Sequence, residues 1–264
     1  MNQLYLKAID SAMDQFDTHC LKNLDHSSLM DRVDSKFVVA AELLPYLLQE
    51  SCRDYSLLSV DGIRQSGYLN VYFDTDGYSY YLMHHNGKLN RIKVRHRHYV
   101  DTGTAFLEIK VKTNKGRTIK SRREASLDAN VAISEHAEFL SEHGIYQSDK
   151  LLPSQIVNYQ RICLSSERLG ERVTMDTGAN FVAPDSGIKV ALDDVVIIEV
   201  KQRRIDRQSP FYRLLRSLCV RPQSFSKYCA GVSLTMENKV KTNRFRHDIN
   251  KVAKVSNSIR TITL

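Results

Sequence analysis

Positively charged side chains occupy every second position between residues 91 and 97, at Arg91, Lys93, Arg95 and Arg97. Side chains of an extended strand alternate between its two faces, so these four charges are expected to point the same way. Such a face repels itself, and a bound polyanion would offset the repulsion. The same alternation recurs in two later segments that each begin with a glutamate: Glu108, Lys110 and Lys112, and then Glu199, Lys201 and Arg203.

If these strands curl into a barrel with their charged faces inward, cations outnumber carboxylates inside it. An unpaired ion removed from water typically costs several kcal/mol, so such an interior must hold water or phosphate-like anions. Arginine binds phosphate oxygens in a bidentate manner, and the few carboxylates could hold a divalent metal that bridges phosphates. The inward positions would be Arg32, Asp34, Lys36, Arg91, Lys93, Arg95, Arg97, Glu108, Lys110, Lys112, Lys120, Arg122, Arg172, Asp176, Glu199 and Lys201.

Other ligands and chemistries fit the sequence less well. Alternating charge on a single strand usually marks a solvated outer face, but several strands with the same positive bias favour an enclosed site. Nucleic-acid binding is disfavoured because the chain has no Trp and its basic strands lack interleaved aromatic residues. The chain contains no P-loop, no GxGxxG motif and no HExxH motif.

The overall composition is that of a soluble, basic protein. The chain has 264 residues, a net charge of +8 and a pI near 9.2, which favour anionic partners. Its five cysteines are scattered, which argues against a disulfide framework or a cysteine zinc site. Neither a signal peptide nor an apolar run of roughly 20 residues is apparent, so we expect a cytoplasmic protein.

The elements that must position these residues follow from periodicity and turn signals. Asn86-Gly87 predicts a type I′ hairpin that joins residues 78–85 to residues 88–99. Two further turns would complete a four-strand antiparallel meander through residues 105–113 and 117–125. Ser134 is expected to cap a helix that ends near Gly144.

The remaining segments complete an α+β fold, an antiparallel β-barrel of about eight strands with flanking helices. We expect three parts: an N-terminal helix over residues 1–26, a barrel domain over residues 27–235, and a basic tail over residues 236–264 that is partly disordered or loosely docked. The other predicted strands are 30–39, 68–73, 156–164, 172–181 and 195–202, and the other predicted helices are 41–49 and 210–218.

Seven short motifs follow one another in this barrel domain: RVDSKF (32–37), YFDT (72–75), KVRHRHY (93–99), LEIK (107–110), RVTMD (172–176), IEVK (198–201) and FSKY (225–228). In this order they resemble the VTC domain, the polyphosphate polymerase module of vacuolar transporter chaperone complexes and of its bacterial relatives. That domain belongs to the triphosphate tunnel metalloenzymes, which also include the CYTH proteins. The resemblance covers nearly the whole predicted barrel.

The resemblance implies a tunnel in which the γ-phosphate of ATP is transferred to a growing inorganic polyphosphate chain, with Mn²⁺ or Mg²⁺ as cofactor. ATP, polyphosphate and pyrophosphate or triphosphate would be its ligands, nucleic acid would not, and passage across a membrane would need a separate membrane protein. Tyr159 would lie beside the nucleotide, and Glu199 and Glu108 would hold the metal. The catalytic residues would be Lys36, Arg95, Arg97, Lys110, Lys120, Arg122, Arg161 and Arg172, with further phosphate contacts from Arg91, Lys93, Lys201, Ser226 and Lys227.

Two departures from related patterns bear on the activity. CYTH enzymes carry ExExK on the first strand, whereas this chain has Arg32, Asp34 and Lys36 there, which favours the VTC branch over a two-metal hydrolase. Polymerase modules can also have a lysine two residues before the Ser-Lys pair, where this chain has Ser224. A metal-dependent tunnel triphosphatase and a non-catalytic polyphosphate-binding module are the alternatives.

Overall fold

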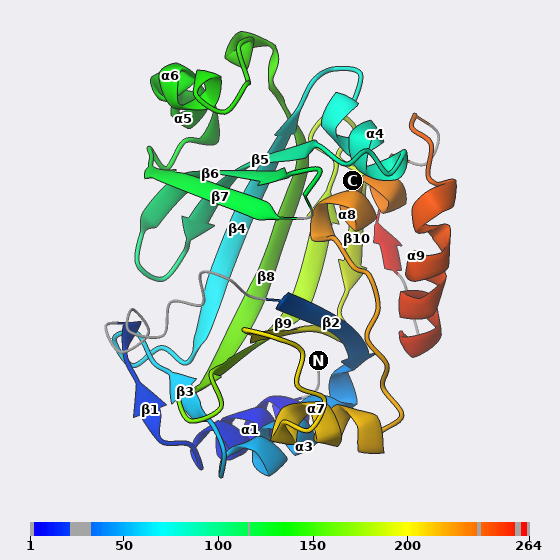
Figure 1. Ribbon diagram of the computed structural model, residues 1–264. Coiled ribbons are helices and arrows are strands. Elements are labelled where there is room, and N and C mark those ends of the chain that lie inside the picture. Colours follow the sequence, from blue (N-terminus) through cyan, green and yellow to red (C-terminus); the bar gives the residue numbers. More distant parts are fainter. Residues whose placement is uncertain (1–2, 22–32, 116, 237–238, 257–259, 263–264) are drawn as a thin grey trace.

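A long antiparallel sheet forms the centre of the computed structural model, which describes residues 3–21, 33–115, 117–236, 239–256 and 260–262 (Figure 1). Eight strands follow one another in the order β7-β6-β5-β4-β8-β9-β11-β2. Their bounds are β2 Val33–Ala40, β4 Gln65–Asp74, β5 Arg91–Tyr99, β6 Thr104–Lys112, β7 Thr118–Glu124, β8 Leu152–Ser166, β9 Glu171–Val182 and β11 Val195–Gln202.

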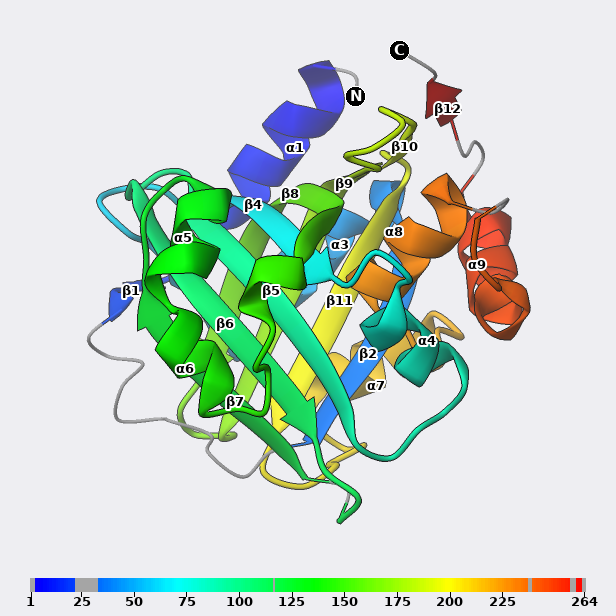
Figure 2. The same cartoon turned by 90° about the horizontal axis from the view of Figure 1, so that it is seen from above.

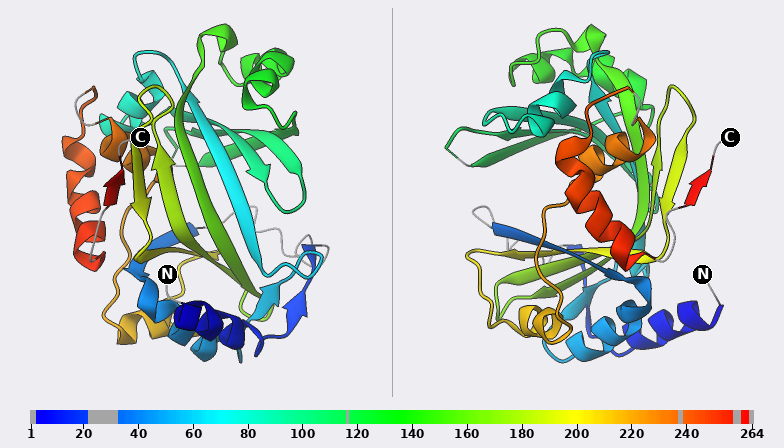
Figure 3. Two further views of the ribbon diagram at one scale, coloured as in Figure 1. Left: turned by 180° about the vertical axis from the view of Figure 1, so that it is seen from behind. Right: turned by 90° about the vertical axis from the view of Figure 1, so that its right-hand side faces the viewer.

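The sheet curls so that its two ends face each other. Strands β4, β8 and β9 form a spine, β5 to β7 form one wing, and β2 with β11 form the other (Figures 1 and 3). We call the concave side between the wings the inner face. Within the described residues β2 and β7 do not pair, so the expected eight-stranded antiparallel α+β architecture is present but hydrogen bonds between these strands do not close the barrel.

Apolar residues that alternate with the charged ones pack on the outer face. Ile198 and Val200 of β11 lie in a cluster with helices α1 Gln3–Met13, α3 Leu44–Ser51 and α7 Pro210–Ser217. Val94 of β5 and Leu107 and Ile109 of β6 pack against the short helices α5 Ala129–Glu135 and α6 Ala137–Ser141. Burial of these alternate residues turns the charged residues between them toward the inner face.

One helix lies inside the curl rather than outside it. Helix α8, Lys227–Thr235, fills one end of the space between the wings, beside α4 Ser79–His85 and α9 Asn243–Val255 (Figures 1 and 2). Its residues Tyr228, Cys229 and Val232 share a buried cluster with Val38 and Ile197. The inner face is therefore apolar at this end and is cationic elsewhere.

Short elements complete the fold at the sheet's edges. Strand β1, Thr18–His19, pairs in parallel with β3, Ser56–Leu58, which pairs in turn with β8. Strand β10, Lys189–Leu192, pairs in antiparallel orientation with β9 on one side and with β12, Arg260–Ile262, on the other. Two 3-10 helices, η1 Ala41–Leu43 and η2 Ser148–Lys150, precede α3 and β8.

The predicted hairpin at Asn86-Gly87 is wrong, because residues 79–85 form α4. The buried carboxylate of Asp74 accepts hydrogen bonds from the backbone N–H groups of Tyr80 and Tyr81, both at 2.8 Å, and so satisfies donors in the first turn of the helix. Asn86 has φ −83°, whereas a type I′ turn needs positive φ at both central residues. The four-strand meander exists, but its first strand is β4.

Both ends of the chain also differ from expectation. Helix α1 ends at Met13, well before residue 26, because Thr18 and His19 pair with β3; residues 22–26 and Arg32 lie outside the described residues. The tail is not loosely docked throughout: α9 buries Val252, which is 2% exposed. Asn243 Oδ1 lies 2.7 Å from His85 Nε2, which ties the start of α9 to α4.

The cap before residue 144 is Asp128 rather than Ser134. Asp128 Oδ1 accepts from the backbone N–H groups of Asn130 at 2.8 Å and Val131 at 3.3 Å. Ser134 lies inside α5 and donates to the carbonyl oxygen of Val131. In the described ranges, none of the helices combines the length and the apolar character that a membrane crossing would require.

We predict that Gly231→Ala lowers the free energy of unfolding by roughly 1–3 kcal/mol, although alanine is the better helix former in an exposed helix. A Cβ at residue 231 would lie 2.8 Å from both Gln155 Cδ and Phe181 Cδ1. Gln155 is fully buried and hydrogen-bonded to Val182 and Thr235, so it cannot move aside cheaply. Urea unfolding measures the change.

Gly77→Ala is the matched control, since a Cβ there would meet no atom within 4 Å. Its stability should stay within about 0.5 kcal/mol of wild type. Equal effects of the two substitutions would contradict the close packing of α8 on the sheet.

Candidate functional site

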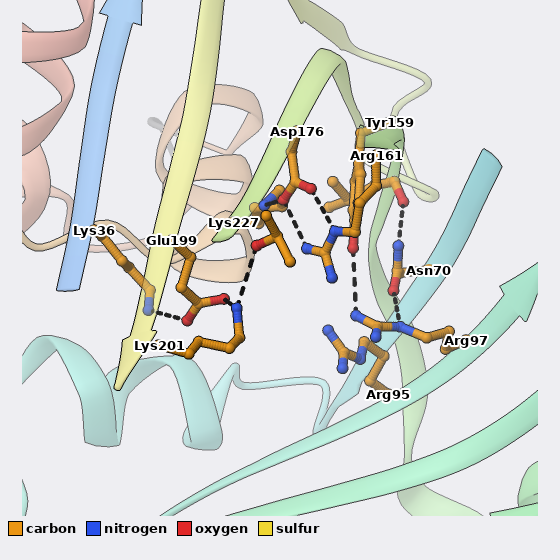
Figure 4. A network of polar contacts seen from close by, with 12 residues as sticks. Lys36, Asn70, Arg95, Arg97, Tyr159, Arg161, Asp176, Glu199, Lys201 and Lys227 are labelled. Carbon is orange, nitrogen blue, oxygen red and sulfur yellow. Dashed lines mark hydrogen bonds and ion pairs between the residues drawn. The ribbon is translucent and has the colours of Figure 1, made fainter. Parts of the chain in front are cut away.

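A lysine–glutamate–lysine group lies on the β2–β11 wing. Lys36 and Glu199 are cross-strand neighbours, and Lys36 Nζ lies 2.5 Å from Glu199 Oε1 (Figure 4). Lys201 Nζ lies 2.7 Å from Glu199 Oε2 and also donates to Thr174 Oγ1 at 3.2 Å. Burial alone would raise the pKa of Glu199, but the two lysines hold it well below the usual range. Glu199 is therefore a carboxylate, and each of its oxygens is ion-paired.

The opposite wing repeats this arrangement around Glu108. The Glu108 side chain is only 1% exposed and is ion-paired with Arg95, while Lys120 Nζ lies 2.8 Å from its other oxygen. Arg97 Nε lies 4.0 Å from Glu108 Oε2. Burial opposes ionisation of Glu108, but these cations lower its pKa far below the ordinary value. Burial depresses the pKa of Lys120 as well, and the ion pair offsets only part of that effect.

Asp176 links the spine to helix α8. Arg161 donates to both oxygens of the Asp176 carboxylate, at 2.5 and 2.8 Å, and Lys227 at the start of α8 pairs with one of them (Figure 4). Burial raises the pKa of Asp176, but Arg161 and Lys227 outweigh it and bring the pKa to about 2. The bidentate geometry also fixes the plane of the Arg161 guanidinium.

The N-terminus of α8 reaches the second wing through its cap. Ser226 Oγ accepts the backbone N–H of Cys229 and lies 2.9 Å from Lys93 Nζ of β5. Lys227, the next residue, contacts the spine through Asp176. Lys93 of β5 and Lys227 therefore both lie at the N-terminus of α8, and the N-terminus of a helix favours anions.

Lys110 is an inner-face cation that makes no hydrogen bond or ion pair to any residue that the structure describes. It lies on β6 opposite Lys93 and Lys120. Burial first, and then the charges of Arg95 and Arg97, lower the pKa of Lys110 well below that of a free lysine. Glu108 and, from the opposite wing, Glu199 act to raise the Lys110 pKa, but burial and the two arginines outweigh them.

Tyrosine rings support the arginines from the spine. Tyr68 and Tyr159 stack with their ring centroids 5.2 Å apart, and the Arg161 guanidinium lies over both rings. Tyr159 accepts a hydrogen bond from Arg97 Nη2 at 3.3 Å, and Tyr72 accepts one from Arg95 Nη1 at 3.2 Å. Burial raises the pKa of Tyr72, but Arg95 with its cationic neighbours outweighs burial and lowers it.

Three predicted residues lie at the margins of this group. Arg122 is exposed, with its guanidinium 4.9 Å from the centre of the Phe106 ring. Arg91 is partly buried near the end of β5 and lies 3.4 Å from the carbonyl oxygen of Lys88. Arg172 lies opposite Lys201, and its buried Nε has no hydrogen-bond partner among the described residues.

The structure thus brings most of the predicted site residues onto one face, and it adds neutral ones that were not predicted. Asn70 accepts from Arg97 Nε at 3.1 Å, and Tyr68 and Tyr72 contact the arginines. All three alternate along β4, so strand periodicity would have placed them together with the charges. Their lack of charge removed the signal that marked the other strands.

The carboxylates determine whether a divalent metal fits. In the described part of the chain, no group of three or more His, Cys, Asp or Glu side chains could share an ion. Of the two predicted metal ligands, Glu199 is 22% exposed and Glu108 is 1% exposed, so Glu199 is the one that can be reached readily. Mg²⁺ is commonly held by one or two carboxylates together with substrate phosphates. The residues therefore fit an ion held largely by phosphate oxygens, and not an all-protein metal cage.

The chain belongs to the VTC domain family, because the model of that family matches residues 31–236. A comparison with curated proteins found no match. Similar solved structures include a protein from Bacillus halodurans proposed to be an adenylate cyclase, with 16% identity, 75% of this chain and 96% of that chain covered, and a TM-score of 0.48. A Hippeastrum protein, proposed to be an adenylyl cyclase and reported to have a dominant triphosphatase activity, has 12% identity, 80% and 97% coverage and a TM-score of 0.49.

We predict that Lys110→Met stabilises the ligand-free protein at neutral pH by on the order of 1 kcal/mol and weakens tripolyphosphate binding. A lysine whose pKa is lowered by folding destabilises the fold below that lowered pKa, and the cost disappears as pH rises to the ordinary value. The stability gain should therefore shrink as pH approaches about 10.5. Urea unfolding at several pH values and calorimetric titration measure the two effects.

Lys112→Met is the control, since Lys112 lies on the same strand two residues further on and is exposed. It should change stability by less than about 0.5 kcal/mol. If Lys110→Met destabilises the empty protein, Lys110 is not an uncompensated charge.

Proposed function

We propose that this chain is a polyphosphate polymerase that transfers the γ-phosphate of ATP to the end of an inorganic polyphosphate chain. Membership of the VTC domain family supports this function, and the observation that carries it is the surplus of cations on the inner face. Three carboxylates, Glu108, Asp176 and Glu199, are all ion-paired, yet Lys110 is left without a counter-ion among the described residues. A bound phosphate chain supplies the missing negative charge.

The reaction needs positioning and charge neutralisation more than it needs covalent chemistry from the protein. Arg95, Arg97 and Arg161 would bind the transferred phosphoryl group, since their guanidinium planes are already fixed by carboxylates and tyrosines. The acceptor is itself a phosphate, so no side chain has to act as nucleophile. When a divalent ion is bound, it neutralises charge on the phosphates, and Glu199 would be its protein ligand.

Two neighbouring groups of the site would have different tasks. Ser226 and Lys227, with Lys93, form a polar group at the start of α8 that suits a phosphate at one end of the substrate. Lys227 Nζ lies 4.6 Å from the centre of the Tyr159 ring, and the stacked rings of Tyr159 and Tyr68 would suit the nucleotide. Glu108 would act as a buried counter-ion that orients Arg95, rather than as a metal ligand, because both of its oxygens are buried against cations.

Purified protein incubated with ATP and Mn²⁺ or Mg²⁺ should produce long-chain polyphosphate together with ADP. Gel analysis of the polymer and chromatography of the nucleotides measure both products. Release of inorganic phosphate without polymer would instead identify a triphosphatase. Saturable binding of polyphosphate without turnover would identify a non-catalytic binding module.

Glu199→Gln should reduce kcat by at least about tenfold, which corresponds to 1.4 kcal/mol of transition-state stabilisation, because it removes the reachable carboxylate. The neutral amide keeps the size of the side chain but leaves Lys36 and Lys201 without their counter-ion, so the thermal unfolding midpoint should also fall, and kcat is compared at a temperature at which both proteins are folded. Glu124→Gln, at an exposed position of β7, is the control and should leave kcat unchanged. If the two variants are equally active, Glu199 does not hold the metal.

A further inference from the structure

A stretch of arginines lies outside the inner face, between β11 and α8. Residues 203–221 contain six arginines and no lysine, and their only carboxylate is Asp206. All six arginines are exposed, and none has an ion pair with another residue that the structure describes. We call this set the arginine segment: Arg203, Arg204, Arg207, Arg213, Arg216 and Arg221.

The segment is held rigidly rather than as a loose loop. Gln202 donates to the carbonyl oxygen of Asp206 at 3.0 Å and accepts from its backbone N–H at 3.0 Å, which closes the turn after β11. Ser209 caps α7, and Phe211 and Leu215 of that helix are 1% and 0% exposed in the outer core. Arg213 and Arg216 are three residues apart on the opposite, exposed side of α7.

Both ends of the segment connect directly to the candidate site. Arg203 follows Lys201 by two residues, and Lys201 lies on the inner face beside Glu199. Beyond Arg221, the chain runs along β2, where the backbone N–H of Gln223 donates to the carbonyl oxygen of Lys36 at 2.8 Å. It then reaches Ser226 and Lys227 at the start of α8. The arginine segment is therefore the stretch of chain that links two parts of the phosphate site.

The chemistry of the segment favours one kind of partner. An amphipathic helix that binds a membrane inserts exposed apolar side chains, and Ile205 is the one large apolar residue of this stretch that is clearly exposed. Single-stranded nucleic acid needs exposed aromatic rings, but Phe211 and Tyr212 are buried. Six unpaired guanidinium groups, with Ile205 as the single clearly exposed large apolar residue and no exposed aromatic ring among them, match a chain of phosphates that carries no bases.

We propose that the arginine segment is a second binding surface for inorganic polyphosphate, on which the part of a long chain that lies outside the inner face is held. This inference rests on the proposed function, because it assumes that the inner face binds the end of the same polymer. A short ligand that fits within the inner face would not reach the segment. Affinity for long chains should therefore depend on these arginines, and affinity for tripolyphosphate should not.

Calorimetric titration of Arg213→Gln/Arg216→Gln and of Arg203→Gln/Arg204→Gln with two probes tests this surface. Long-chain polyphosphate should bind each double variant roughly tenfold more weakly, with a shallower dependence on salt, since fewer counter-ions are released. Tripolyphosphate should bind with an affinity within about twofold of wild type. Lys251→Gln/Lys254→Gln, also exposed cations three residues apart on a helix, is the matched control and should bind both probes like wild type.

Each other outcome overturns the inference. Equal loss of long-chain binding in the α9 control would mean that only net charge matters. Unchanged long-chain binding in the arginine variants would show that the surface is not used. Loss of binding to phosphatidylglycerol vesicles, with polyphosphate binding intact, would assign the segment to a membrane surface. If the wild-type protein does not bind tripolyphosphate, the inner face is not a phosphate site and the proposed function itself is wrong. The outcomes above, in contrast, concern the arginine segment alone.

Discussion

Mutual repulsion among the inner-face cations is the constraint on which the arrangement of this protein depends. The fold reduces this repulsion by placing each of three carboxylates between two cations. Glu199 is paired within the β2–β11 wing, Glu108 is paired within the other wing, and Asp176 is paired with cations of the spine and of α8. Removing either partner of such a buried pair leaves an uncompensated charge, which is why the groups are interdependent. The compensation is incomplete, as Lys110 shows, and an anionic ligand would stabilise the folded state by mass action.

Helix α8, near the end of the chain, also contributes to the pairing of charges on the inner face. Its first residues contact Lys93 and Asp176, so a single helix start joins the β5 wing to the spine. The helix is held in place by the hydrogen bond from Tyr228 to the buried Asp74 carboxylate and by the stacking of Tyr228 on Tyr72. The start of α8 is therefore positioned by contacts within the protein, which favours a preorganised site.

The charged part of this site could be predicted from sequence, because alternation on β5, β6 and β11 follows directly from strand geometry. Other parts depended on contacts that no local pattern contains. The Asp74 carboxylate accepts hydrogen bonds from the first turn of α4, and this contact stabilises a helix where the sequence predicted a hairpin. On β9, register irregularity near Gly178, whose φ is +58°, lets Asp176 and Ala179 share the inner face although they are three residues apart. Neutral Asn70 carried no charge signal at all.

The separation of packing from chemistry along single strands has an evolutionary consequence. Ile198 and Val200 hold β11 to the outer core, whereas Glu199 and Lys201, which alternate with them, contribute nothing to that apolar cluster. Selection can therefore act on the two sides of one strand almost independently: the outward residues are constrained by stability and the inward ones by substrate. A scaffold of this kind can diversify toward new anionic substrates through inward substitutions alone, while its fold is inherited unchanged.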